Sequence, residues 1–130
     1  MKKIAILLIV LMIASIDFLS GCNEDKVAVQ SDEEKLIGTW TYSINFNETT
    51  INTSYVFLSN KTLEIFFSYY INSSAIGDNI RSNGTWNITD NKLIMILEGE
   101  TVISDYSFSN NDKTLTITES SGNTSVFTKK

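Results

Sequence analysis

From residue 36 onward the chain alternates apolar and polar residues in short segments. The first segment alternates Trp40, Tyr42, Ile44 and Phe46 with threonine, serine and asparagine. A period of two is typical of a half-buried β-strand. Seven further segments have strand composition: residues 54–59, 62–71, 85–89, 92–98, 101–107, 113–119 and 124–128. The sequence therefore predicts eight strands.

Turn-forming residues separate the predicted strands. They are Asn-Glu-Thr-Thr, Ser-Asn-Lys, Thr-Asp-Asn, Glu-Gly-Glu, Asn-Asn-Asp and Ser-Ser-Gly-Asn, and side chains of these types satisfy the backbone of tight turns. The short spacings leave no room for the crossover helices that parallel strands need. Sequential antiparallel pairing is therefore predicted, and the fold class is all-β: a small antiparallel up-and-down β-barrel of eight strands.

The N-terminus has the pattern of an export signal. Lys2 and Lys3 precede an apolar run over residues 4–16, whose length fits a signal-peptide core and is short for a membrane span. The next residues, Leu19-Ser20-Gly21-Cys22, resemble the lipobox of bacterial lipoproteins. That resemblance implies cleavage before Cys22 and lipid on its sulfur. An ordinary secreted protein cleaved near Gly21, or one with a retained N-terminal anchor, are the alternatives, and each would also export the domain.

The sequence predicts three parts: a lipoprotein signal peptide over residues 1–21, a flexible acidic tether over 22–35, and a β-barrel domain over 36–130. Ser31 and Glu34 have the spacing of a capping box, so a helical turn is predicted over residues 32–37. Cys22 is the only cysteine. Lipidation there places the protein at the cell membrane, on the extracytoplasmic side.

Composition argues against several classes of function. The chain carries a formal net charge of −5 and a single arginine, Arg81, which is unfavourable for binding nucleic acid. It has no histidine, so imidazole-based catalysis and imidazole metal sites are excluded. Glu98 and Glu100 flank a glycine and are more simply explained as a solvated hairpin turn than as a glycosidase pair. We expect no enzyme activity, metal or cofactor.

The triplet Gly-Thr-Trp occurs twice, at residues 38–40 and 84–86. "LIGTW" near the start of the domain, "NGTWNITDNKLIMIL" in its middle and "LTIT" with "SVFTK" at its end resemble the small lipocalin-like domains of bacterial lipoproteins. The resemblance covers residues 36–130 and implies that Gly38 and Trp40 close the base of a barrel. In larger lipocalins an arginine near the last strand packs over this tryptophan. Only Lys129 and Lys130 are available here.

Large side chains are expected to face the inside of the barrel. The predicted interior comprises Trp40, Tyr42, Phe57, Leu63, Ile65, Phe67, Tyr69, Trp86, Met95, Tyr106 and Phe108. An eight-stranded barrel either is filled by such side chains or holds one small ligand. For the second case, the predicted ligand-binding residues are Trp40, Tyr42, Phe67, Tyr69, Trp86 and Tyr106.

The connection over residues 72–83 is expected to be the longest loop and to form the mouth of a pocket. The predicted function is non-catalytic binding or sensing of a small apolar or amphipathic ligand by a membrane-anchored lipoprotein. The alternative is a filled barrel that acts as a protein-interaction or structural module of the cell envelope, including an inhibitor role. Aromatic residues on both faces of the strand over 62–71 fit either function.

Overall fold

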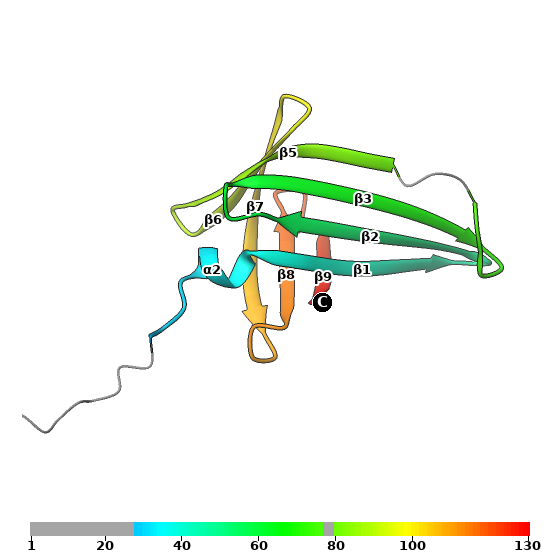
Figure 1. Ribbon diagram of the computed structural model, residues 1–130, viewed down its shortest axis with the longest axis horizontal. Coiled ribbons are helices and arrows are strands. Elements are labelled where there is room, and N and C mark those ends of the chain that lie inside the picture. The colour runs from blue at the N-terminus through cyan, green and yellow to red at the C-terminus, as the bar shows by residue number, and fades with distance from the viewer. Residues whose placement is uncertain (1–27, 77–79) are drawn as a thin grey trace, which may run out of the picture. The chain divides into compact units, whose positions relative to one another are not determined.

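The computed structural model describes residues 28–76 and 80–130 (Figure 1). The predicted signal peptide, Cys22 and the first part of the predicted tether lie outside the described residues. Residues Ser31–Lys130 form one compact unit. Its elements are α2 (Asp32–Leu36), β1 (Gly38–Phe46), β2 (Thr49–Phe57), β3 (Thr62–Ile71), β4 (Ser74–Ala75), β5 (Ile80–Thr89), β6 (Lys92–Leu97), β7 (Glu100–Ser109), β8 (Thr114–Glu119) and β9 (Thr124–Lys129).

The strands close into an antiparallel barrel of eight strands, as the sequence predicts. Each strand pairs with its neighbour in the order β2-β1-β9-β8-β7-β6-β5-β3, and pairing between β2 and β3 completes the ring. The joint between first and last strands is short, because β1 pairs with β9 only at Trp40 and Thr41. A backbone hydrogen bond of 2.9 Å from Lys130 N to Thr39 O extends this joint.

Tight turns connect most neighbouring strands at the predicted positions. Asp90 and Asn91 between β5 and β6, and Glu98 and Gly99 between β6 and β7, all have positive φ. Two consecutive residues of positive φ match the right-handed twist of a hairpin, and Asn, Asp and Gly tolerate this conformation best. The turn residues seen in the sequence therefore determine where the strands reverse.

Two strands begin earlier than predicted. β2 starts at Thr49 rather than at residue 54, because the turn needs only Asn47 and Glu48, and β-branched threonines favour strands. β5 starts at Ile80 rather than at residue 85, since its first residues pair with β3. The predicted long loop over 72–83 is therefore wrong: β4 and β5 use part of it, and only residues 76–79 connect them.

Helix α2 confirms the predicted helical turn. Ser31 Oγ accepts a hydrogen bond from Glu34 N at 3.3 Å, and the Glu34 carboxylate accepts one from Ser31 N at 2.8 Å, which is the predicted capping box. The helix brings Leu36, which is fully buried, against the barrel. The last residues of the predicted tether are thus helical.

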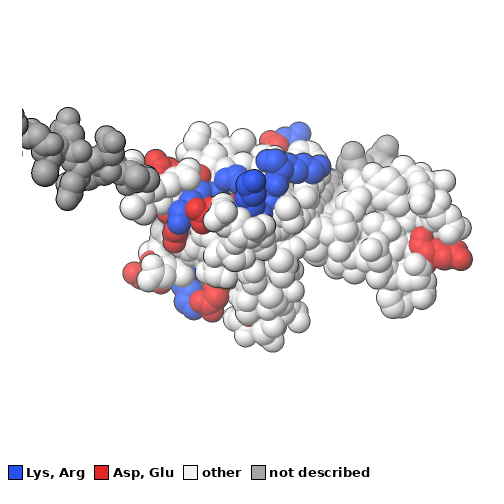
Figure 2. All heavy atoms as spheres, turned by 90° about the horizontal axis from the view of Figure 1, so that it is seen from below, with Lys and Arg blue, Asp and Glu red and all other residues white. Residues whose placement is uncertain are grey.

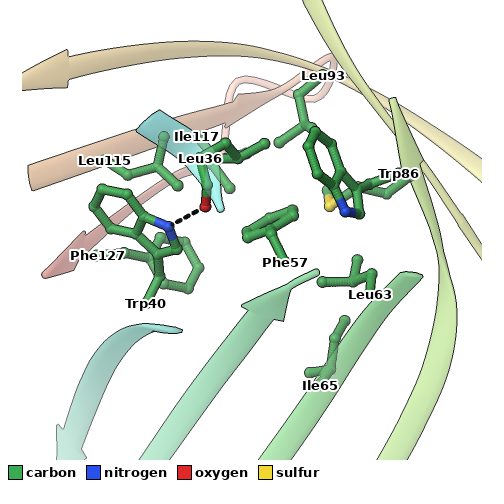
Figure 3. Packing of buried hydrophobic residues seen from close by; sticks show 11 residues of the cluster. Leu36, Trp40, Phe57, Leu63, Ile65, Trp86, Leu93, Leu115, Ile117 and Phe127 are labelled. Carbon is green, nitrogen blue, oxygen red and sulfur yellow. Dashed lines mark hydrogen bonds between the residues drawn. The ribbon is translucent and has the colours of Figure 1, made fainter. Parts of the chain in front are cut away.

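The hydrophobic core lies in the half of the barrel next to α2 (Figure 3). We call this end the base and the opposite end the mouth. The fully or almost fully buried residues are Leu36, Trp40, Phe57, Leu63, Ile65, Trp86, Leu93, Met95, Leu115, Ile117 and Phe127. Phe57 and Trp86 meet edge to face, with ring centroids 5.6 Å apart. The base half is therefore filled by side chains of the protein itself.

Candidate functional site at the mouth of the barrel

The two Gly-Thr-Trp triplets close the base in the same way. Trp40 Nε1 donates to Leu36 O at 2.7 Å, and Trp86 Nε1 donates to Leu58 O at 3.1 Å. A lysine ammonium lies over each indole: Lys129 Nζ is 5.1 Å from the Trp40 ring centroid, and Lys61 Nζ is 4.3 Å from that of Trp86. Each of the two tryptophans at the base is thus covered by a lysine.

At the mouth, part of the sheet extends beyond the closed barrel (Figure 1). Beyond Thr41, β1 pairs only with β2, and beyond Phe67, β3 pairs only with β2 and β4. We call this extension the lip: residues 42–46 of β1, 49–53 of β2, 68–71 of β3, and β4. Its inner face continues the inner face of the barrel but has no opposite wall.

The inner face of the lip is apolar. Strand register places Ile44 opposite Ile51 and Ile51 opposite Tyr69, all on the side that carries Trp40 and Phe57 further down the strands. The Ile76 N–H donates to Tyr69 O at 2.9 Å, which continues the register of β3 with β4 and places Ile76 opposite Tyr69 on this face. At the tip of the lip, Phe46 is 73% exposed. Together with Thr49 and Thr53 of the same face, these side chains form a largely apolar surface that leads into the mouth.

The outer face of the lip is polar. Ser43 Oγ donates to Asn52 Oδ1 at 2.5 Å, and Thr50 Oγ1 donates to Asn45 Oδ1 at 2.8 Å. Charged groups are scarce throughout the lip: Glu48 is the only charged residue between Thr41 and Leu58. Figure 2 shows this contrast, with few charges on the lobe at the right and many of both signs at the α2 end. Solvent therefore meets neutral polar groups on one face and apolar groups on the other.

A pocket of about 470 Å³ lies where the lip meets the barrel. Its lining residues are Tyr55, Ile65, Phe67, Ile80, Ser82, Leu97, Glu98 and Glu100. The volume lies in the range of small-molecule sites, about 300–1,000 Å³, and a mostly apolar lining with a few polar groups is typical of such sites. Buried Ile65 forms the floor, whereas Ile80 is 54% exposed at the entrance.

The polar groups of this pocket are grouped on one side. Glu98 and Glu100 belong to the β6–β7 turn, and Ser82 Oγ donates to Glu98 Oε1 at 3.4 Å. The two glutamates are thus a solvated hairpin turn, as expected. Burial, followed by the negative charges that Tyr42 and Glu119 can carry, raises the pKa of Tyr55 from 10.0 to about 12. The Tyr55 hydroxyl therefore stays protonated and neutral at physiological pH.

A second pocket, of about 290 Å³, lies beside α2 at the base. There Tyr106 Oη donates to Asp32 Oδ2 at 2.9 Å, and Lys35 Nζ lies 3.6 Å from carboxylate oxygens of both Asp32 and Asp112. Burial, followed by the hydrogen bond to Asp32, raises the pKa of Tyr106 to about 12. Because its polar groups already pair with one another, this pocket offers few free contacts to a ligand.

The structure places the six predicted ligand-binding residues in three regions. Trp40 and Trp86 are packed in the core of the base and do not line the mouth pocket. Phe67 lines that pocket, and Tyr42 and Tyr69 lie on the apolar face that leads to it. Tyr106 lines the small pocket beside α2. Three of the six are therefore grouped at the mouth and lip.

The remaining residues of the mouth pocket were not predicted as site residues. Tyr55 lies within the strand predicted over residues 54–59 and shares the parity of buried Phe57, so applying the alternation to this strand would have found it. Ile80 and Ser82 belong to the segment over 72–83 that was expected to form the mouth of a pocket, but they lie on β5 rather than in a loop. Glu98 and Glu100 carried no signal beyond that of a turn.

No described residues form a group of three or more acidic, histidine or cysteine side chains that could hold a metal ion. Within the described ranges, no helix is long and apolar enough to cross a membrane. Comparison of the sequence with protein-family models and with curated proteins finds no match.

Proposed function

We propose that this protein is a lipoprotein of the cell envelope, anchored by lipid on Cys22, whose barrel binds one small amphipathic molecule at its mouth without chemical change. The observation that carries the binding proposal is the largely apolar inner face of the lip, which leads into a pocket of about 470 Å³. Exposed apolar surface of this extent is costly in water and is typical of binding surfaces.

The filled base supports binding at the mouth rather than deep in the barrel. Trp40, Phe57 and Leu63 are fully buried and leave the ligand only the upper part. The ligand's apolar part would cover Ile80, Phe67 and the inner face of the lip, and its polar part would remain at the opening. Burial of apolar surface supplies about 25 cal/mol per Å² toward such binding.

The anchoring proposal rests on the sequence around Cys22. A single acyl chain binds a membrane only marginally, whereas the diacylglyceryl group implied by the lipobox resemblance anchors a protein stably. Replacing Cys22 with serine should release the protein from the membrane fraction or leave it as an uncleaved precursor. Continued lipid labelling of the Cys22→Ser protein would contradict lipidation at this residue.

Native mass spectrometry of the full chain, purified from its own host under mild conditions, tests ligand binding. We expect an added mass of small-molecule size that is lost on denaturation. Ile80→Asn should reduce the bound fraction about tenfold, since it places an amide in the apolar entrance. The matched control is Val126→Asn, because Val126 is 55% exposed, against 54% for Ile80, and lies on β9 away from the pocket lining.

A second candidate function is binding of a protein partner, and the edge of β1 favours it. Residues 42–46 of β1 pair only with β2, so one row of backbone groups is free to pair with an extended segment of another chain. If the full chain carries no small molecule and gains none from added lipids, this candidate replaces the first. Ser43→Pro should then abolish partner capture, whereas Val126→Pro should not.

A further inference from the structure

We infer that the ligand of the mouth pocket carries a positively charged headgroup; this inference rests on the proposed function and specifies its ligand class. The pocket lining contains two carboxylates, Glu98 and Glu100, beside an apolar wall. A molecule with an apolar body and a cationic end would match both parts of the lining.

No described residue that lines the pocket is a lysine or arginine. Arg81, the nearest candidate along β5, alternates to the outer face of the strand, where it pairs with Glu64 and lies over Phe66. Lys61 and Lys129 are at the base, over the two tryptophans. The carboxylates at the mouth are therefore free of a protein cation within the described part of the pocket.

The charge at the mouth distinguishes between classes of amphiphile. An anionic headgroup, such as that of a fatty acid, would lie beside two like charges and be repelled. A cationic headgroup would gain an ion pair at the edge of an apolar wall, where solvent screening is weaker than in open water. Tyr55 and Phe67 add aromatic surfaces to the same lining, and aromatic faces attract ammonium groups.

The geometry also gives the ligand an orientation. Glu98 and Glu100 lie on the β6–β7 turn, whereas Phe67 and Ile80 form the junction between the pocket and the lip. The cationic end would lie at the β6–β7 turn, and the apolar chain would extend over Phe67 and Ile80 along the inner face of the lip. A chain that reaches the lip would cover Tyr69 and Ile44.

The test compares three probes whose chains have ten carbons, the carboxyl carbon of decanoate included: decyltrimethylammonium, decanoate and decyl glucoside. The full chain is reconstituted in phosphatidylcholine nanodiscs, and calorimetric titrations are corrected with empty nanodiscs. We expect the cation to bind about tenfold more tightly than decanoate, with the glucoside between them. Raising salt from about 20 mM to about 500 mM should reduce this ratio, because exposed charges are screened.

Two double variants, each of which removes two negative charges, identify the groups responsible for the preference for cations. Glu98→Gln with Glu100→Gln should bring the ratio of cation to decanoate affinity down to about twofold or less. Asp90→Asn with Asp112→Asn removes the same charge at the base end and should leave the ratio unchanged.

The possible outcomes separate the inference from the proposed function. If all three probes bind the unaltered chain equally, or if the glutamine variant keeps the ratio, the cationic ligand class is wrong while amphiphile binding stands. If none of the probes binds, both the inference and the proposed function fail. The inference is established if the unaltered chain prefers the cation, the Glu98 and Glu100 changes remove that preference, and the Asp90 and Asp112 changes do not.

Discussion

Glu98 occupies a backbone position that is unfavourable for glutamate. Its φ is 52°, followed by Gly99 at 86°, which is the conformation that Asn-Gly favours in a hairpin. We predict that Glu98→Asn raises the free energy of unfolding by about 0.5–1 kcal/mol, because asparagine tolerates this conformation better. Urea unfolding followed by tryptophan fluorescence measures the change.

The same substitution should weaken the preference of the mouth for cations, because it removes one of two carboxylates. A variant that gains stability and loses selectivity would indicate that Glu98 is retained for binding. A Glu98→Asn protein less stable than the unaltered one would contradict this prediction and would mean that the glutamate side chain stabilises the turn.

Lys129 is a structural cation of the base. Its ammonium donates to Lys35 O at 2.7 Å, and a Cβ on Gly38 would lie only 3.1 Å from Lys129 Cε. Lys129→Met keeps the apolar stem but leaves the carbonyl of Lys35 without this donor, and it should cost about 2 kcal/mol of unfolding free energy. The matched control is Lys113→Met at an exposed position, which should change stability by less than about 0.5 kcal/mol. Equal effects of the two changes would contradict the role of Lys129.

At the scale of the elements, the lip and the barrel should differ in stability. The lip has three long strands and one open side, whereas the barrel is a closed ring around the core. Local opening needs little energy where few apolar contacts are broken. We predict that amide hydrogens of β1 and β2 within the lip exchange at least about tenfold faster than those of β8 around Leu115.

Hydrogen exchange with mass spectrometry or NMR measures this difference. A matched comparison uses one strand: Ile51 lies in the lip part of β2 and Phe57 in the barrel part. Equal protection of the two residues would mean that the lip is as stable as the barrel, and addition of a ligand should protect Ile51 selectively.

The strands and turns of the barrel could be predicted because they depend on local sequence. Alternation places Trp40, Phe57 and Trp86 inside, and Asn, Asp and Gly residues mark the reversals. The starts of β2 and β5 were missed because the residues around them are polar and resemble a loop. Thr49 follows Asn47 and Glu48, and Ile80 lies between Asn79 and Arg81. Their strand conformation depends on pairing with β1 and β3, which local sequence does not reveal.

The candidate site was predicted less well than the fold. Aromatic character alone does not distinguish Trp40, which is packed at the base, from Phe67, which lines the pocket. Distinguishing them requires knowing which end of the barrel is filled, and that depends on α2 and Leu36 reaching the base. The role of Glu98 and Glu100 likewise depends on how the β6–β7 turn faces β3.

At the scale of the whole molecule, the stable core and the proposed binding surface lie at opposite ends of the barrel. The base holds the buried tryptophans, the lysines over them and the cap formed by α2. The mouth holds an apolar surface that the protein leaves uncovered. Changes at the mouth should therefore alter binding with little loss of stability, and changes at the base should do the reverse.

Alkaline unfolding tests how the mouth contributes to the stability of the whole barrel. The pKa of Tyr55 is about 12 in the folded protein, whereas the ordinary value for a tyrosine is 10.0. The folded state therefore holds the phenol proton more tightly than the unfolded state does. This contribution to stability is complete below pH 10 and is lost as the pH rises toward 12.

We predict that the free energy of unfolding falls between pH 10 and pH 12 by about 2 kcal/mol more in the unaltered protein than in Tyr55→Phe. Urea titrations at several pH values measure both slopes. Tyr106→Phe is the matched comparison: the pKa of Tyr106 is also raised to about 12, but this residue sits beside Asp32 at the solvent-exposed base. Solvent screening makes its effect smaller. If the two variants flatten the alkaline slope equally, burial at the mouth is not what holds the Tyr55 proton.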